Sequence, residues 1–241
     1  MTKIRLDHAL VQKQLVTSRS QAESWIKLGK VLVNGRTVTK PGVFVNPDAV
    51  LALDAKEQYV SRAGLKLASV ARLLKLDFRG KTVLDVGSST GGFTDYALKH
   101  GAKKVYAVDV GTDQLHPSLR SNPAIELHEK TDIRNFYLEV KPDIIVIDVS
   151  FISLREILPH LAEQLSGSGT VIAAMLKPQF EAGKDQTNKG VIKNDAVRRQ
   201  VLKDFEAWAK GYFVVIDKRD SDVHGAKGNQ ERFYLLKPTR I

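Results

Sequence analysis

The sequence contains no cysteine among its 241 residues. Disulfides and thiolate metal sites are thereby excluded, which fits a reducing compartment without requiring one. No hydrophobic run approaches the ~18 apolar residues that a membrane-spanning helix needs. The first residues also lack the apolar stretch and the small-residue cleavage pattern of a signal peptide. We therefore expect a cytoplasmic protein with no membrane partner.

Acidic residues are in the minority. There are 37 Lys and Arg against 27 Asp and Glu, which gives a formal net charge of +10. Residues 1–60 hold 9 of the basic and 5 of the acidic residues, so this part is about twice as basic per residue as the rest. A basic protein is a candidate partner for polyanions, although a merely solvated surface remains the alternative. The six histidines show no metal-ligand spacing, so we expect no metal.

Residues 1–57 have the pattern of a small α+β module. We expect one helix marked by Leu6, Leu10 and Leu15, and a second that runs to Leu28. Ser18 and Gln21 would form a capping box at the start of the second helix, and Gly29 would end it. Asn34-Gly35 is a hairpin signal. The expected strands are 31–33, 43–45 and 49–53, and the polar residues 54–59 are the expected linker.

From residue 61 onwards, apolar β-rich runs alternate with helical stretches. This alternation predicts βαβ units and an α/β fold with a mostly parallel sheet covered on both faces. We expect strands at 82–86, 104–108, 143–147 and 170–176, and helices near 93–100, 152–165 and 195–209. A late antiparallel hairpin is expected from strands at 213–216 and 232–236.

A glycine-rich turn follows the apolar strand that ends at Val86 and precedes a predicted helix. Glycine lets the backbone approach a ligand closely, and ligands of open α/β sheets bind at the carboxyl ends of the strands. The glycines are spaced G-x-x-x-G-G, and Asp85 stands just before the first one. A carboxylate there suits a cationic methyl donor better than a pyrophosphate, which needs clustered helix N–H groups. The turn therefore predicts S-adenosyl-L-methionine as the cofactor.

Other acidic residues follow the later strands. Asp109 is placed to accept hydrogen bonds from both ribose hydroxyls of an adenosine. Asp132 either reads the adenine amino group, with Ile133 against the ring, or caps a helix. Asp148 is expected to point at the transferred methyl group. The expected cofactor-binding residues are Asp85, Gly87, Ser88, Ser89, Thr90, Gly91, Gly92, Phe93, Asp109, Val110, Asp132, Ile133 and Asp148.

Five segments resemble the TlyA family: residues 59–67, 85–93, 148–153, 176–181 and 228–231. Proteins of that family are named hemolysins but include ribosomal-RNA 2′-O-methyltransferases, and their methyltransferase half is similar to the FtsJ type. The resemblance covers essentially the whole chain. It implies a Rossmann-like class I methyltransferase domain with a seven-stranded sheet over residues 64–241, preceded by a linker at 58–63.

The same resemblance implies a catalytic tetrad of Lys66, Asp148, Lys177 and Glu231. A lysine beside a ribose hydroxyl can hold the oxygen and stabilise developing negative charge, and two lysines with two acids balance in charge. We assign Lys177 as the base or hydroxyl-contacting group, Asp148 and Lys66 as groups that orient it, and Glu231 as completing the network. Taken singly, Lys66 could equally be an exposed helix lysine, and Glu231 could pair with a neighbouring Arg232 or Lys227.

The N-terminal module, residues 1–57, resembles an S4 RNA-binding domain, which presents basic side chains to structured RNA. Folded RNA is recognised largely through shape and phosphate contacts, which suits spread positive charge. The expected RNA-binding residues are Arg5, Arg19, Lys27, Lys30 and Arg36. The expected partner is therefore ribosomal RNA or a ribosomal subunit. The alternatives are a non-catalytic RNA-binding assembly factor that retains a cofactor pocket and a membrane-active hemolysin.

Overall fold

The structure is a computed structural model. It describes residues 2–16, 18–27, 29–54, 59–187, 190–225 and 227–239. Contacts divide the chain into two units, Met1–Arg62 and Ala63–Ile241, here called the N-terminal and C-terminal units. Residues 55–58, which belong to the linker expected from the sequence, lie outside the described residues, as does Leu28.

The N-terminal unit is a small α+β fold in which Leu6, Leu10 and Ile26 are fully buried. A three-stranded antiparallel sheet has the order β3-β2-β5, and β1 pairs with β4 separately. The elements are β1 (Ile4–Arg5), α1 (Leu6–Gln12), α2 (Arg19–Lys27), β2 (Val31–Val33), β3 (Arg36–Val38), β4 (Phe44–Val45) and β5 (Leu51–Leu53).

Local signals in this unit act largely as expected. The backbone N–H of Gln21 donates to Ser18 Oγ at 3.2 Å, and the Gln21 side chain also donates to the Tyr59 carbonyl. Gly29 has φ +69° and its N–H closes the end of α2, while Asn34 at φ +49° turns the β2–β3 hairpin. The first helix is shorter than expected, because the chain leaves it through a positive φ at Gln14.

The C-terminal unit is built on a seven-stranded sheet of order β11-β12-β10-β9-β6-β7-β8. The five strands from β10 to β8 are parallel, and β11 and β12 form the antiparallel hairpin at one end. The expected α/β fold is thereby confirmed. The strands are β6 (Thr82–Val86), β7 (Lys104–Val108), β8 (Ile125–His128), β9 (Ile144–Ile147), β10 (Val171–Leu176), β11 (Phe213–Asp220) and β12 (Arg232–Pro238).

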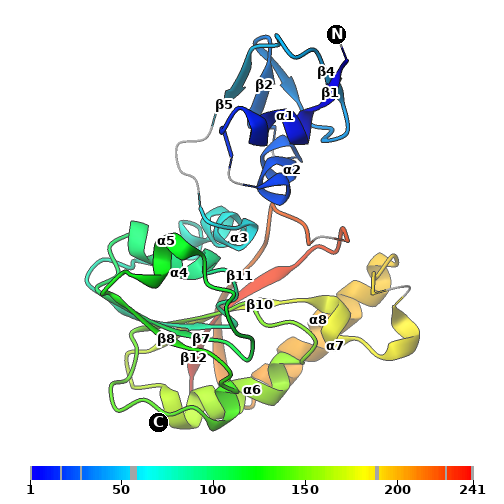
Figure 1. The fold of residues 1–241 in the computed structure, drawn as a ribbon. Helices are drawn as coiled ribbons and strands as arrows, with labels where there is room; N and C mark the ends of the chain where they lie inside the picture. The colour runs from blue at the N-terminus through cyan, green and yellow to red at the C-terminus, as the bar shows by residue number, and fades with distance from the viewer. Residues whose placement is uncertain are drawn as a thin grey trace. The chain divides into compact units, whose positions relative to one another are not determined.

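Helices cover both faces of this sheet. Figure 1 shows α3, α4 and α5 on one side and α6 and α8 on the other. The helices are α3 (Arg62–Ala71), α4 (Gly92–Lys99), α5 (Pro117–Arg120), α6 (Leu154–His160), α7 (Pro178–Glu181) and α8 (Asp195–Ala209), with single turns at Ile133–Asn135 and Lys184–Gln186. Alternate strand residues such as Leu84, Ile145 and Ile172 pack with Leu158 and Phe205 in one fully buried cluster.

The boundaries differ from the sequence expectations in a few places. The helix expected over 152–165 is α6 followed by a wider π-helical turn, Leu161–Leu165, just after Pro159. Strand β11 continues to Asp220 through a register shift between Val215 and Asp217. The sequence expectations gave no range for helix α3, for the strand before Asp132, which is β8, or for the short α5 and α7.

Candidate functional site

A cavity of about 450 Å³ opens at the carboxyl ends of β6, β7 and β9. Its apolar wall includes Ile133 and Ile157, and its polar lining has three carboxylates, Asp109, Asp132 and Asp148, against one cation, Arg134. Parallel strands place such a cavity where their ends converge. The excess of acid suits a cationic ligand and disfavours a pyrophosphate, as the sequence indicated.

The glycine-rich turn brings the end of β6 against the end of β9. Gly87 has φ +79°, and a Cβ at that position would lie 2.8 Å from the Asp148 carbonyl oxygen. Only glycine combines this backbone conformation with so close an approach. Gly87 and Ser89 line the cavity. Gly91 instead makes room for packing, because a Cβ there would lie 2.6 Å from a methyl carbon of Leu119.

Backbone N–H groups of the glycine-rich turn and of the segment after Asp109 hold its carboxylate in place. One of its carboxylate oxygens accepts from the N–H of Ser89 at 2.8 Å and the other from the N–H of Gly111 at 2.7 Å. Gln114, which also lines the cavity, accepts from the Ser89 hydroxyl. The carboxylate therefore has a fixed orientation at the cavity, where its remaining lone pairs are available to the paired hydroxyls of a ribose.

Asp85 lies beneath the turn and not in the cavity wall. Its side chain is fully buried, and one oxygen accepts from the Thr94 hydroxyl at 2.6 Å. Burial raises the pKa of Asp85 to about 7, the Thr94 hydrogen bond opposes the rise, and the charge of Asp148 adds to it. Five other residues expected at the cofactor also lie outside the wall of the cavity. These are Ser88, Thr90, Gly91, Gly92 and Phe93, of which Phe93 packs on Phe233.

The sequence left Asp132 open between an adenine contact and a helix cap, and the structure shows the cap. Asp132 lines the cavity, and it also caps the turn that begins at Ile133 by accepting from the N–H of Arg134 at 3.0 Å. The Arg134 side chain donates to Asp132 Oδ1 at 3.0 Å and to Oδ2 at 2.6 Å, and these hydrogen bonds lower the pKa of Asp132. Ile133 is buried, and Val110 is exposed at the rim.

The first half of the expected tetrad is an ion pair between neighbouring strand ends. Lys177 follows β10 and its Nζ lies 2.6 Å from Asp148 Oδ1, just after β9. The same Nζ donates to Ser150 Oγ at 2.8 Å. The side chains of Lys177 and Asp148 are 10% and 14% exposed, so the pair is largely shielded and still reachable from solvent.

The second half is a buried pair between Lys66 on α3 and Glu231 just before β12. Lys66 Nζ lies 2.5 Å from Glu231 Oε2, and the two side chains are 8% and 2% exposed. Lys66 is therefore not an exposed helix lysine. The register pairs Leu176 with Arg232, and the residues next to that pair are Lys177 and Glu231. Both ion pairs therefore lie at the same end of the sheet, where β9 and β10 end and β12 begins. Lys66 contacts Glu231 and not Lys177.

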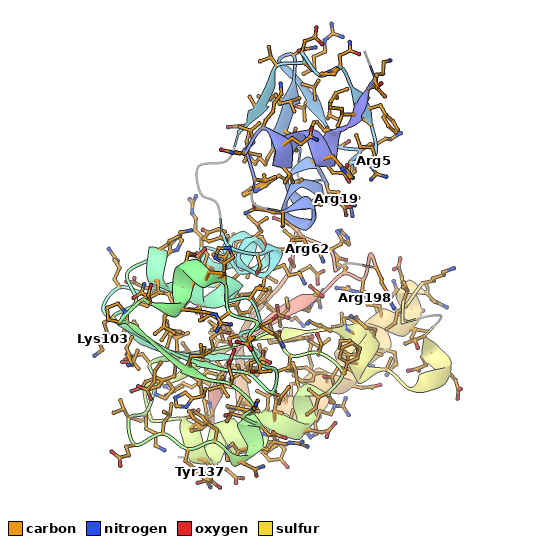
Figure 2. All side chains as sticks on the ribbon, viewed as in Figure 1. Arg5, Arg19, Arg62, Lys103, Tyr137 and Arg198 are labelled. Carbon is orange, nitrogen blue, oxygen red and sulfur yellow. The ribbon has the colours of Figure 1, made fainter. Side chains whose placement is uncertain are left out.

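The basic residues expected to bind RNA divide into two groups. Arg5 and Arg19 both bind the fully buried Asp7, at 2.8 and 3.0 Å, and Figure 2 shows them on the same side of the N-terminal unit. Burial would raise the pKa of Asp7, but the hydrogen bonds from the two arginines lower it to about 2. Lys27, Lys30 and Arg36 are exposed.

Several residues at the cavity had no sequence-based assignment. Ser150, Gln114, Arg134 and Phe151 line it, and Phe151 is 91% exposed with φ +67°, in ring contact with Phe180 at 5.1 Å. The sequence did offer a signal for Phe151, because it is a large aromatic residue in the short segment that follows an apolar strand. Every helix within the described residues is too short or too polar to span a bilayer.

Comparison with known proteins gives two domain matches. The FtsJ-like methyltransferase model matches residues 59–237, and the S4 domain model matches residues 4–51. These matches confirm the methyltransferase fold and the S4 domain predicted from the sequence, and with them S-adenosyl-L-methionine as the cofactor.

Similar proteins align along nearly the whole chain. A 23S rRNA (cytidine-2′-O)-methyltransferase, TlyA, from Campylobacter jejuni is 38% identical over 93% of this chain and 96% of its own length. Hemolysin A from Brachyspira hyodysenteriae is 37% identical over 95% of this chain and 97% of its own. A solved structure, named as a hemolysin, from Streptococcus thermophilus has a TM-score of 0.74 at 38% identity, over 99% of this chain and 90% of its own. The chain therefore belongs to the FtsJ-like methyltransferases, in the TlyA group that joins an S4 domain to the methyltransferase domain.

Proposed function

We propose that the protein transfers a methyl group from S-adenosyl-L-methionine to a ribose 2′-hydroxyl of ribosomal RNA. The observation that carries the proposal is the shielded Lys177–Asp148 pair at the ends of β9 and β10, where Asp148 lines the cavity. The name of the Campylobacter jejuni relative, at 38% identity, agrees with this acceptor. A ribosomal substrate would place the activity in the cytoplasm, as the cysteine-free sequence also suggests.

The residues present fit the cofactor. Asp109 would hold the ribose hydroxyls, Ile133 would pack on the adenine, and the wall formed by Gly87 and Ser89 would lie against the methionine portion. When bound, S-adenosyl-L-methionine supplies a methyl group made electrophilic by the positive charge on its sulfur. The acidic lining of the cavity stabilises a positive charge of that kind.

In this proposal Lys177 contacts the acceptor hydroxyl. Asp148 and Ser150 fix the position of its Nζ, so the lysine can hold the hydroxyl oxygen, and once it has released its own proton to solvent the neutral amine can take the hydroxyl proton. The buried Lys66–Glu231 pair would complete the network at this end of the sheet. Two lysines with two carboxylates carry no net charge, which makes their burial tolerable.

We further propose a division of labour along the chain. Residues 1–57 would bind RNA through Arg5, Arg19, Lys27, Lys30 and Arg36, residues 58–63 would link the domains, and residues 64–241 would catalyse the transfer. The expected absence of a resident metal remains part of the proposal, since a lysine–carboxylate set can serve this chemistry without one.

Labelled methyl incorporation tests the proposed reaction. Purified ribosomal subunits and naked ribosomal RNA are incubated with the protein and methyl-labelled S-adenosyl-L-methionine, and the modified nucleotides are mapped by mass spectrometry. We expect label on a ribose. Lys177→Ala and Asp148→Ala should each lower turnover by at least about 100-fold, because the positioned proton acceptor is lost or misoriented.

The control for these variants is Lys218→Ala, which removes a lysine from a 2.7 Å ion pair with Glu206 on β11 and α8. It should retain turnover. Full activity of both Lys177→Ala and Asp148→Ala would refute the tetrad assignment. Cofactor binding without incorporation into any ribosomal particle would favour a non-catalytic assembly factor instead.

A further inference from the structure

Two loops carry the proposed chemistry, and they leave neighbouring parallel strands. The loop 148–153 follows β9 and contains Asp148 and Ser150, and the segment 177–181 follows β10 and contains Lys177. Neither segment belongs to the hydrogen-bonded sheet, so contacts outside the strands must fix its position. The geometry of the Lys177–Asp148 pair therefore depends on what fixes these two segments to each other.

Glu181, the last residue of α7, joins the two segments at their far ends. Its side chain is only 2% exposed. Oε2 accepts from Ser153 Oγ at 2.6 Å, and Oε1 accepts from the N–H of Leu154 at 2.7 Å. Both donors stand at the beginning of α6, so the carboxylate fixes the point where the loop 148–153 enters that helix.

Capping α6 does not by itself call for a buried carboxylate. Ser153 already caps the helix by accepting from the N–H of Arg155 at 3.1 Å. Burial raises the pKa of Glu181, and the cation beside it, Arg155, keeps its Nε 3.8 Å away. Two short hydrogen bonds to a charged acceptor are strong and directional, which suits a link between segments that must not shift.

The loop 148–153 is thus attached to the same partner segment at both of its ends. Lys177 binds its beginning through Asp148, and Glu181 binds its end through Ser153. Between them the rings of Phe151 and Phe180 are in contact at 5.1 Å. We propose that Glu181 is a positioning residue that locks the Asp148-bearing loop onto the Lys177-bearing segment and so sets the geometry of methyl transfer.

The proposal rests on the proposed methyl transfer, and Glu181→Ala tests it in the full-length protein. We expect kcat to fall on the order of 10-fold to 100-fold, because small misplacements of reacting groups are costly. The KM for RNA should change by less than about threefold. The Kd for S-adenosyl-L-methionine, measured by calorimetry, should also change by less than about threefold, since most of the residues expected to contact RNA or the cofactor lie outside this loop. Glu181→Gln keeps one oxygen acceptor and loses the charge and the second acceptor, so it should recover part of kcat.

Hydrogen exchange gives a readout that does not need turnover. In Glu181→Ala, peptides covering residues 149–156 should exchange faster, while peptides covering β6 should not change. This result separates failure of the lock from failure of the proposed reaction. Unchanged exchange at 149–156, or a fall in kcat that merely matches the loss of folded protein, would overturn the proposal.

Ser153 supplies a second, independent variant if Glu181→Ala does not fold. Ser153→Ala removes one donor to Glu181 and should lower kcat severalfold, whereas Ser153→Thr keeps the hydroxyl and should remain active. Where both single variants fold, the double variant with Ala at both positions should be no worse than Glu181→Ala, because the two side chains form one link. Additive losses, or wild-type kcat in Ser153→Ala, would contradict the lock.

Discussion

At the scale of single residues, burial decides what a carboxyl group can do. Asp85 and Asp109 were both expected to bind the cofactor, Asp85 because it precedes the glycine turn and Asp109 because it closes the next strand. Asp109 lines the cavity with its oxygens oriented by backbone N–H groups, whereas Asp85 is enclosed beneath the glycine turn, where the Thr94 hydroxyl donates to it. Their proximity in the fold does not give them the same role.

The buried Asp85 makes folding stability depend on pH. Its folded-state pKa of about 7 lies above the ordinary value of 3.8, so over this range the folded chain keeps a proton that the unfolded chain has released. Stability should therefore fall as pH rises from about 4 to about 7. In Asp85→Asn, which cannot ionise, denaturant midpoints measured from pH 4 to 7 should decline less steeply than in the wild type. Equal declines would show that Asp85 ionises normally.

At the scale of elements, the glycine turn between β6 and α4 is the feature that shapes the cavity. Gly87 is the residue through which the backbone of β6 meets the carbonyl of Asp148 on the neighbouring strand. Gly80 offers a natural comparison, because it has a similar φ of +69° with nothing within 4 Å of an added Cβ. Comparing alanine substitutions at Gly80 and Gly87 therefore separates the cost of a left-handed backbone from the cost of a steric clash.

Gly87→Ala should cost more than Gly80→Ala. Each substitution places an alanine in the left-handed region, at about 1–2 kcal/mol, and Gly87→Ala adds a clash with the Asp148 carbonyl. We expect Gly80→Ala to lower Tm modestly and to leave cofactor affinity unchanged. Gly87→Ala should lower Tm further and weaken cofactor binding at least about 10-fold. Thermal unfolding and calorimetry would measure both, and equal effects would exclude a special role for the close approach.

At the scale of the whole molecule, a basic S4 domain precedes a methyltransferase domain whose cavity lining is acidic. The opposite charges suit two different ligands, a polyanion and a sulfonium cation. Within the N-terminal unit, Arg5 and Arg19 also support the fold through Asp7, so their loss would disturb stability. Lys27, Lys30 and Arg36 are exposed, so substitutions there test the proposed RNA binding more directly.

Replacing Lys27, Lys30 and Arg36 together with alanine should weaken binding to ribosomal RNA. The slope of log K against log salt should become shallower by about 2–3, since each lost phosphate contact contributes about 0.7–0.9. The affinity for S-adenosyl-L-methionine should not change. Replacement of Lys75, Lys103 and Lys210, exposed lysines of the C-terminal unit, is a charge-matched control. A similar slope change in the control would indicate that net charge alone drives binding.

The sequence by itself determined the features that local patterns encode. The alternation of strands and helices predicted the parallel sheet, and helix α8 was predicted with its observed bounds. The turn signals at Gly29 and Asn34 act as expected, because turns and helix ends depend on the residues that form them. Family motifs pointed to the four charged residues of the tetrad in advance.

Only the tertiary structure decided how those residues are paired and enclosed. Lys66 is buried against Glu231, Lys177 meets Asp148, and Glu181 reaches the start of α6, each across a long stretch of sequence. Such contacts depend on which strands are neighbours and where their ends align. The raised pKa of Asp85 likewise follows from burial under the glycine turn, because loss of water and not the identity of adjacent residues sets the cost of its charge.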